Sequence, residues 1–186
     1  MYGLVNQGIR EMVIKQCGDA AWDELRAKVG LERDDFSAMD TYPDALTYDL
    51  VGAASEKLGL SPEEILKAFG KHWITYTAKS GYGDMMDTWG DNLVEFLENL
   101  NSLHTSLSIA MPDLKPPAFE IEHVDTDNRT LTLNYYSERE GLTPMVIGML
   151  EGLGDRFETP VEAQITRTKT SPSDCDQFAV SWREKE

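Results

Sequence analysis

The spacing of the apolar residues changes near residue 117, and this change requires a fold that combines helices with a sheet. Before that point apolar side chains recur every three or four residues, which is the period of an amphipathic helix. After it, apolar and polar residues alternate, as in half-buried strands. Pro112, Pro116 and Pro117 mark the boundary, because proline cannot continue a helix. We therefore expect an α+β fold, in which a helical N-terminal lobe packs on a C-terminal lobe with a small antiparallel sheet and a helix.

The individual elements can also be predicted from local signals. Ser61-Pro62-Glu63-Glu64 predicts a helix start, since Ser61 can cap it, Pro62 fits its first turn and Glu64 completes a capping box. Gly81 and Gly83 should end that helix. Further helices are expected at about 4–13, 20–29, 43–58, 91–110 and 145–157, and strands at 119–121, 131–137, 161–169 and 178–183.

The charge of the chain excludes several classes of partner. Asp and Glu number 33 against 17 Lys and Arg, a formal net charge of −16. Such a surface repels phosphate groups, so neither nucleic acid nor an anionic membrane is an expected partner. No apolar run approaches the roughly 18 residues of a membrane span, and no signal-peptide pattern is present. We therefore expect a cytoplasmic protein, in which Cys17 and Cys175 are reduced thiols.

Among the three histidines, His104 stands apart because it interrupts a leucine-rich stripe on the helix expected at 91–110. A buried imidazole needs a partner, either a backbone carbonyl in the core or a metal ion. From position alone the hydrogen-bonded core histidine is the commoner arrangement. Both interpretations stay open on this residue by itself.

The segment Tyr135-Tyr136-Ser137-Glu138-Arg139 is the second candidate for chemistry. Alternate side chains of a strand share a face, so Tyr135, Ser137 and Arg139 should point the same way. Two hydroxyls and a guanidinium suit a carboxylate or phosphate, although the polar outer face of a strand has the same pattern. Together with His104 and Pro116-Pro117, these groups fit haem, which needs a ligand for its iron, apolar walls and donors for two carboxylates.

The opening Met1-Tyr2-Gly3-Leu4-Val5-Asn6, His104 in its leucine-rich helix and the Tyr-x-Ser-x-Arg motif together resemble the haem–nitric oxide/oxygen binding (H-NOX) family. The resemblance runs from Met1 to about Trp182 and is greatest to the cyanobacterial stand-alone members; the family also contains the haem domain of soluble guanylate cyclase. It implies one haem-binding sensor domain over 1–186, with a helical lobe of about 1–65 and a proximal haem-binding lobe of about 66–186. Haem b (iron protoporphyrin IX) would lie between the lobes.

The resemblance also implies roles for single residues. His104 would bind the iron, Tyr135, Ser137 and Arg139 would hold the propionates, and Pro117 would press a pyrrole ring out of plane. The other implied haem contacts are Phe96, Leu100 and Leu103 on the proximal side, Trp73, Tyr82, Met145 and Met149 on the distal side, and Met1.

The function implied by the resemblance is gas sensing rather than catalysis. Nitric oxide, or carbon monoxide, would bind ferrous iron, and nitric oxide would weaken the bond to His104 so that the lobes shift and signal to a histidine kinase or a diguanylate cyclase. Met145 stands where oxygen-binding members carry a tyrosine, which favours nitric oxide over oxygen.

The alternatives are an oxygen-binding haem sensor, a haem enzyme or small hydrolase, and a haem-free adaptor in which Arg139 forms a structural salt bridge. No GxSxG or HExxH motif supports an enzyme.

Overall fold

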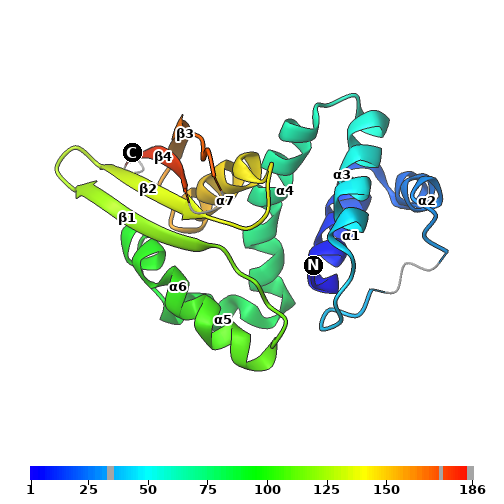
Figure 1. Ribbon diagram of the computed structural model, residues 1–186, viewed down its shortest axis with the longest axis horizontal. Coiled ribbons are helices and arrows are strands. Elements are labelled where there is room, and N and C mark those ends of the chain that lie inside the picture. The colour runs from blue at the N-terminus through cyan, green and yellow to red at the C-terminus, as the bar shows by residue number, and fades with distance from the viewer. Residues whose placement is uncertain (33–35, 172–173, 184–186) are drawn as a thin grey trace.

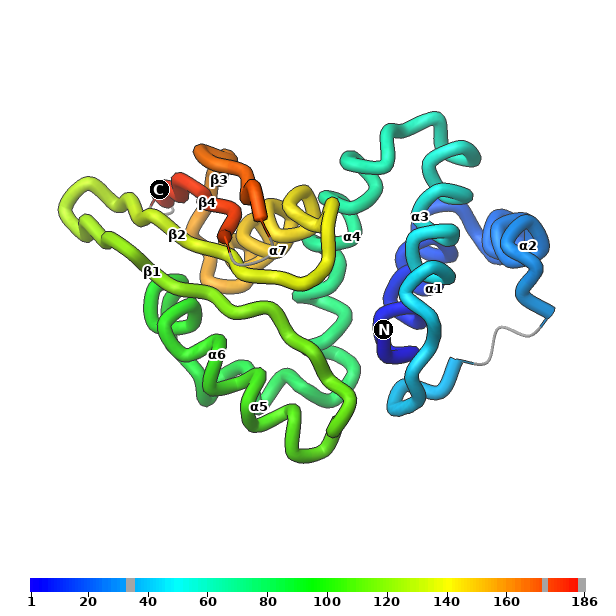
Figure 2. Tube along the Cα trace, in the orientation of Figure 1, coloured from blue at the N-terminus to red at the C-terminus, as the bar shows by residue number. Residues whose placement is uncertain are grey.

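The computed structural model describes residues 1–32, 36–171 and 174–183 and confirms the α+β fold (Figure 1). Three N-terminal helices lie together at one side of the molecule: α1 (Gly3–Cys17), α2 (Asp19–Lys28) and α3 (Asp44–Leu58). The sheet lies at the opposite side. Between them lie α4 (Pro62–Thr77) and α7 (Thr143–Arg156). Helices α5 (Gly83–Thr88) and α6 (Leu93–Ala110) lie on the same side of the molecule as the sheet (Figure 2).

The sheet is antiparallel throughout, with the order β1-β2-β4-β3. Its strands are β1 (Ala118–Asp125), β2 (Thr130–Tyr136), β3 (Val161–Arg167) and β4 (Asp176–Trp182). Both predicted hairpins are therefore confirmed, but the strand ends differ from the expectation. In particular, β2 ends at Tyr136, so Ser137 lies in the connection to α7 rather than in a strand.

The predicted start of α4 is confirmed in atomic detail. Ser61 Oγ accepts a hydrogen bond from the Glu64 amide at 3.2 Å, and Glu64 Oε2 accepts one from the Ser61 amide at 2.8 Å. The break near Gly81 is present too, but α4 ends at Thr77 and Gly83 begins α5 instead of ending a helix. A kinked segment (Ala78–Tyr82) joins the two helices, and in it Gly81 adopts φ +96°, a conformation that favours glycine. This segment places Tyr82 close to the interior of the molecule.

Helices α4 and α7 make an unusually close crossing. A Cβ on Gly70 of α4 would lie 2.0 Å from the carbonyl oxygen of Met145. One on Gly148 of α7 would lie 1.9 Å from the carbonyl oxygen of Lys67. Because no side chain fits between them, the two backbones pack directly together, and this contact fixes the spacing between the residues that they carry.

Two hydrophobic cores lie on either side of this crossing. The N-terminal core contains Ile9, Trp22, Leu50 and Phe69, among others. The core beneath the sheet includes Phe96, Leu133, Leu150 and Phe178. Trp73 of α4 packs against both cores. The exact division into lobes near residue 65 stays a prediction.

Two further observations concern the whole described chain. Cys17 and Cys175 are both free thiols. Among the described residues, no helix combines the length and the apolar composition that a membrane crossing requires.

Candidate functional site

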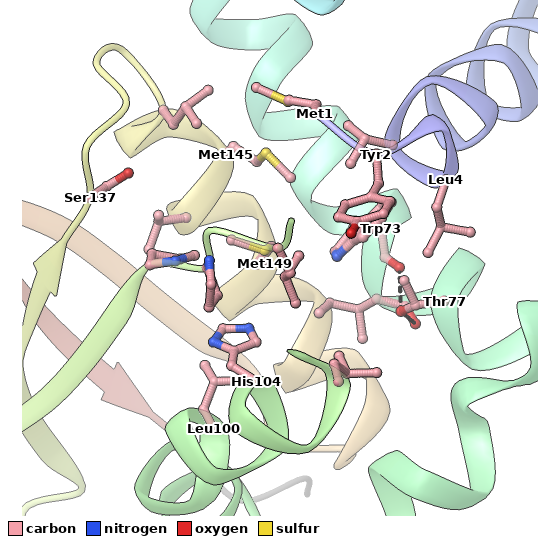
Figure 3. A pocket seen from close by; sticks show the side chains of 18 of the residues that line it. Met1, Tyr2, Leu4, Trp73, Thr77, Leu100, His104, Ser137, Met145 and Met149 are labelled. Carbon is pink, nitrogen blue, oxygen red and sulfur yellow. Dashed lines mark hydrogen bonds between the residues drawn. The ribbon is translucent and has the colours of Figure 1, made fainter. Parts of the chain in front are cut away.

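A cavity of about 320 Å³ lies between the two cores, within the size range of ligand pockets (Figure 3). Its walls are mainly apolar and come from α1, α3, α4, α6, α7 and the segments next to the sheet. The structure brings every residue that the sequence assigned to a haem site to this one cavity: Met1, Trp73, Tyr82, Phe96, Leu100, Leu103, His104, Pro117, Tyr135, Ser137, Arg139, Met145 and Met149. Which groups they bind remains a prediction.

One wall of the cavity is formed by α6, from which His104 projects toward the interior (Figure 3). Its Nδ1 atom is buried and has no hydrogen-bond partner among the described residues. Burial lowers the pKa of His104, while the backbone of Pro117, acting as a hydrogen-bond acceptor, opposes this shift. The imidazole is therefore held in its neutral form, which is the form that binds metal ions.

Asn101, one turn before His104, fastens α6 to the first strand. Its Nδ2 donates to the carbonyl oxygen of Phe119 at 2.6 Å, and its Oδ1 accepts from the Phe119 amide at 2.9 Å. The carboxamide thus satisfies both backbone groups that a neighbouring strand would otherwise pair. This role could not be predicted from the sequence, because an asparagine on the polar side of a helix ordinarily faces solvent.

The opposite, polar end of the cavity contains the clamp loop, which we define as residues 137–141 between β2 and α7, together with Tyr135. The Tyr135 ring is buried, with its centroid 5.3 Å from that of Phe119. The Arg139 amide donates to Ser137 Oγ at 3.1 Å. The expected reason for their common orientation was wrong: strand alternation cannot act beyond Tyr136, and the loop itself brings Ser137 and Arg139 to the cavity.

The guanidinium of Arg139 joins the clamp loop to the N-terminal helices. Its Nε donates to Asp44 Oδ2 at 2.7 Å, and its Nη1 donates to the carbonyl oxygen of Lys115 at 3.0 Å. Asp44, at the start of α3, also pairs with the amino group of Met1. Burial alone would raise the pKa of Asp44, but hydrogen bonds and charge from the Met1 amino group and Arg139 outweigh it and lower the pKa. Arg139 also lines the cavity, and neither of these two hydrogen bonds uses its Nη2.

Two more side chains that the sequence analysis missed hold the backbone of the clamp loop. The Tyr48 hydroxyl of α3 donates to the carbonyl oxygen of Glu140 at 3.1 Å. The Lys169 amino group donates to the carbonyl oxygens of Ser137 at 2.8 Å and Arg139 at 3.3 Å. Both lie far from the loop in sequence, so no local pattern could reveal them.

Trp73, Met145 and Met149 lie across the cavity from His104 (Figure 3). Met145 occupies the wall where the sequence placed it, and it offers no donor group. The nearby Thr77 hydroxyl donates to the Trp73 carbonyl oxygen at 2.8 Å, within its own helix. Three other groups in the lining could donate: the Tyr82 hydroxyl, the Trp73 indole and the Tyr2 hydroxyl, which itself accepts a hydrogen bond from the Asp113 amide at 3.0 Å.

Comparison with known proteins gives a family and several relatives. The family model described as Haem-NO-binding matches residues 2–165. The chain is 30% identical to soluble guanylate cyclase gcy-32 of Caenorhabditis elegans over 159 residues, which covers 84% of this chain and 23% of the relative. It is 38% identical to the guanylate cyclase soluble subunit beta-2 of Rattus norvegicus over 104 residues, or 55% of this chain and 15% of the relative. The chain thus spans less than a quarter of the length of these relatives.

Solved structures with the same fold cover almost the entire chain. The H-NOX protein from S. oneidensis in the Fe(II)NO ligation state superposes with a TM-score of 0.87 at 19% identity, covering 99% of this chain and all (100%) of that one. The unliganded Fe(II) H-NOX protein from K. algicida gives a TM-score of 0.84 at 19% identity, with 100% and 98% coverage. At this level of identity the likeness establishes the fold alone.

Proposed function

Because this chain belongs to the haem-NO-binding family, we propose that it is a haem-based gas sensor that binds nitric oxide and carbon monoxide in preference to oxygen. The observation that carries the proposal is the buried Nδ1 of His104, which lacks a partner among the described residues in the wall of an apolar cavity. A neutral imidazole left in this state costs free energy unless a metal or donor meets it. When bound, haem b would supply a ferrous iron that takes a diatomic gas as a ligand.

The residues around the cavity fit that cofactor in three respects. His104 offers one ring nitrogen to the iron while the backbone of Pro117 provides an acceptor for the ring, the arrangement that orients metal-binding histidines. Leu100 and Leu103 supply an apolar wall for the porphyrin. Pro117 lines the same cavity as His104, and we propose that its ring would press on the bound porphyrin.

The clamp end fits the two carboxylates of the cofactor. Tyr135, Ser137 and Arg139 would hold the propionates, with Arg139 Nη2 as an available charged donor. The same guanidinium already pairs with Asp44 of α3. A change in the position of the porphyrin would therefore pull on the N-terminal helices through one side chain, and we propose that this is how the signal leaves the site. The adaptor alternative accounts for the Arg139–Asp44 ion pair but not for the buried Nδ1 of His104, which has no partner among the described residues.

The preference for nitric oxide rests on the wall opposite His104. Met145 and Met149 cannot donate a hydrogen bond, and Thr77 already donates to the carbonyl of Trp73. A hydrogen bond to bound oxygen would contribute about 1–1.5 kcal/mol, and nitric oxide needs no such donor. Tyr82 and the Trp73 indole are the groups that could reverse this preference, because both line the cavity and carry a hydrogen-bond donor.

We further propose that the domain signals to a partner and is not itself an enzyme. The guanylate cyclases that resemble it are more than four times as long as the matched region, which leaves ample chain for a separate catalytic domain. The partner would be a protein such as a histidine kinase or a diguanylate cyclase, met in the cytoplasm.

Absorption spectra of the anaerobically reduced protein test the proposal, recorded before and after addition of nitric oxide and then of air. The wild type should bind haem, respond to nitric oxide and give no reversible change with oxygen. Met145→Tyr should gain a reversible response to oxygen, and Met39→Tyr, at an exposed position, should not. A reversible oxygen response of the wild type that disappears in Tyr82→Phe would establish the oxygen-sensor alternative. A protein that takes up no haem would overturn the function altogether.

A further inference from the structure

Lys169 reaches the clamp loop from the opposite side to the N-terminal helices. It lies two residues beyond the end of β3, and its amide donates to Asp176 Oδ1 at 2.9 Å. Asp176 is buried at the start of β4, where it pairs across the sheet with Tyr135. The backbone of Lys169 is thus fixed to the same part of the sheet that carries Tyr135, and its amino group extends from there to the carbonyl oxygens of Ser137 and Arg139.

These two contacts matter because the clamp loop has no regular secondary structure after Tyr136. Backbone carbonyls outside helices and strands need other partners, and an ammonium group provides three strong donors. Ser137 and Arg139 also carry the hydroxyl and the guanidinium that line the cavity. Holding their carbonyl oxygens restricts the directions in which those side chains can point.

The charge of the loop gives Lys169 a second effect. Glu138 and Glu140 are exposed carboxylates on either side of Arg139, so the loop by itself carries one net negative charge. The whole chain is also strongly acidic, at −16. Lys169 brings a positive charge to within hydrogen-bond distance of the loop backbone, which offsets that negative charge where an anionic ligand would bind.

We propose that Lys169 is a positioning residue of the carboxylate site: it fixes the backbone of Ser137 and Arg139 and keeps the loop favourable to anions. The identity of the bound carboxylates as porphyrin propionates rests on the proposed function. The effect of Lys169 on the loop does not, and this difference allows the two ideas to be tested separately.

The first arm measures the loop itself in haem-free protein, by backbone amide order parameters of residues 137–141. Wild type should show values near ~0.85, and Lys169→Met should fall below ~0.6, the range of flexible backbone. Lys115→Met is the matched control, since its exposed amino group contacts Glu138 at the same loop but no carbonyl of it. Lys169→Arg should restore order, because a guanidinium also donates to carbonyl oxygens. Where Lys169→Met does not fold, Lys169→Gln replaces it.

The second arm measures binding of metal-free protoporphyrin IX and of its dimethyl ester, which lacks the carboxylates. Lys169→Met should weaken binding of the diacid about tenfold and leave the ester unchanged. In an Arg139→Met background the same change should cost much less, because the two residues act on one contact. Lys57→Met is the control for binding, because this exposed lysine of α3 pairs with Glu24 and does not line the cavity; it should change neither affinity by more than about twofold.

The outcomes separate the two proposals. Unchanged order parameters in Lys169→Met, equal losses for diacid and ester, or additive losses with Arg139→Met would each overturn the role of Lys169. Suppose that the order parameters of the loop fall in Lys169→Met while the wild type binds no porphyrin. The role of Lys169 in positioning the loop would then stand, and the haem-sensor function would be overturned instead.

Discussion

The two ends of the cavity are built in different ways. The His104 end is a continuous helical face, in which the leucine wall and the imidazole follow from the repeat of α6. The polar end is an irregular loop held by residues that are distant in sequence: Asp44 and Tyr48 from α3, Lys169 from beyond β3. A substitution at the first end should therefore remove one interaction and leave its neighbours unchanged. A substitution at the second end should also weaken the other contacts of the loop.

The strongest test of this contrast is His104→Leu. We expect haem affinity to fall by about two orders of magnitude or more, because His104 is the one imidazole among the described residues that line the cavity. The stability of the haem-free protein should change by no more than about 1 kcal/mol, since leucine removes a buried nitrogen without a partner but also loses the hydrogen bond to the Pro117 backbone. Haem titration and urea unfolding of the haem-free protein measure the two effects.

His123→Leu is the control, because His123 is exposed on β1 and lines no part of the cavity. It should alter neither quantity. If His104→Leu were destabilised by several kcal/mol, the imidazole would contribute more to the fold than its one bond to the Pro117 backbone, and the adaptor interpretation would gain.

The contrast also explains what could be predicted from the sequence. The longer helices, the hairpins and His104 on its stripe depend on local periodicity, and the structure has them close to the expected positions, although the strand ends differ. The six-residue helix α5 was not predicted, because it is too short to show a period. The geometry of Tyr135, Ser137 and Arg139 was expected from strand alternation, which failed because β2 ends at Tyr136. The residues missed altogether, such as Asp44 and Lys169, act over sequence distances that no periodic pattern spans.

Asn101 gives the His104 end its own long-range contact, and Asn101→Ala measures how far that end depends on it. Two hydrogen bonds to Phe119 are lost, which should lower the free energy of unfolding by about 1–3 kcal/mol. The midpoint of urea unfolding measures this loss.

Ser102→Ala is the control on the next residue of the same helix, which is exposed and whose side chain makes no hydrogen bond to the described residues. It should leave the midpoint unchanged or slightly raised, because alanine favours helix. A loss below about 0.5 kcal/mol for Asn101→Ala would show that packing alone holds α6 against β1. The His104 end would then depend on α6 itself and not on hydrogen bonds to residues distant in sequence.

The smallest expected effect is a dependence on pH at the polar end, through Asp44. Burial tends to raise the pKa of this carboxyl, but the Met1 amino group and Arg139 lower it below its ordinary value near 3.8. A carboxyl with a lowered pKa stabilises the folded state when it is ionised, so its contribution is complete above about pH 4 and is lost as the pH falls through the folded-state pKa. Because the Asp44 side chain is 40% exposed, the contribution should not exceed about 1 kcal/mol.

The free energy of unfolding between pH 2.5 and 6 should therefore decline less steeply in Asp44→Asn than in the wild type. Asp49→Asn, an exposed change on the same helix, should retain the wild-type slope. Parallel curves for the wild type and Asp44→Asn would mean that the ion pair with Arg139 adds nothing to stability, and the order of the polar end would then depend on its other contacts, such as those of Tyr48 and Lys169.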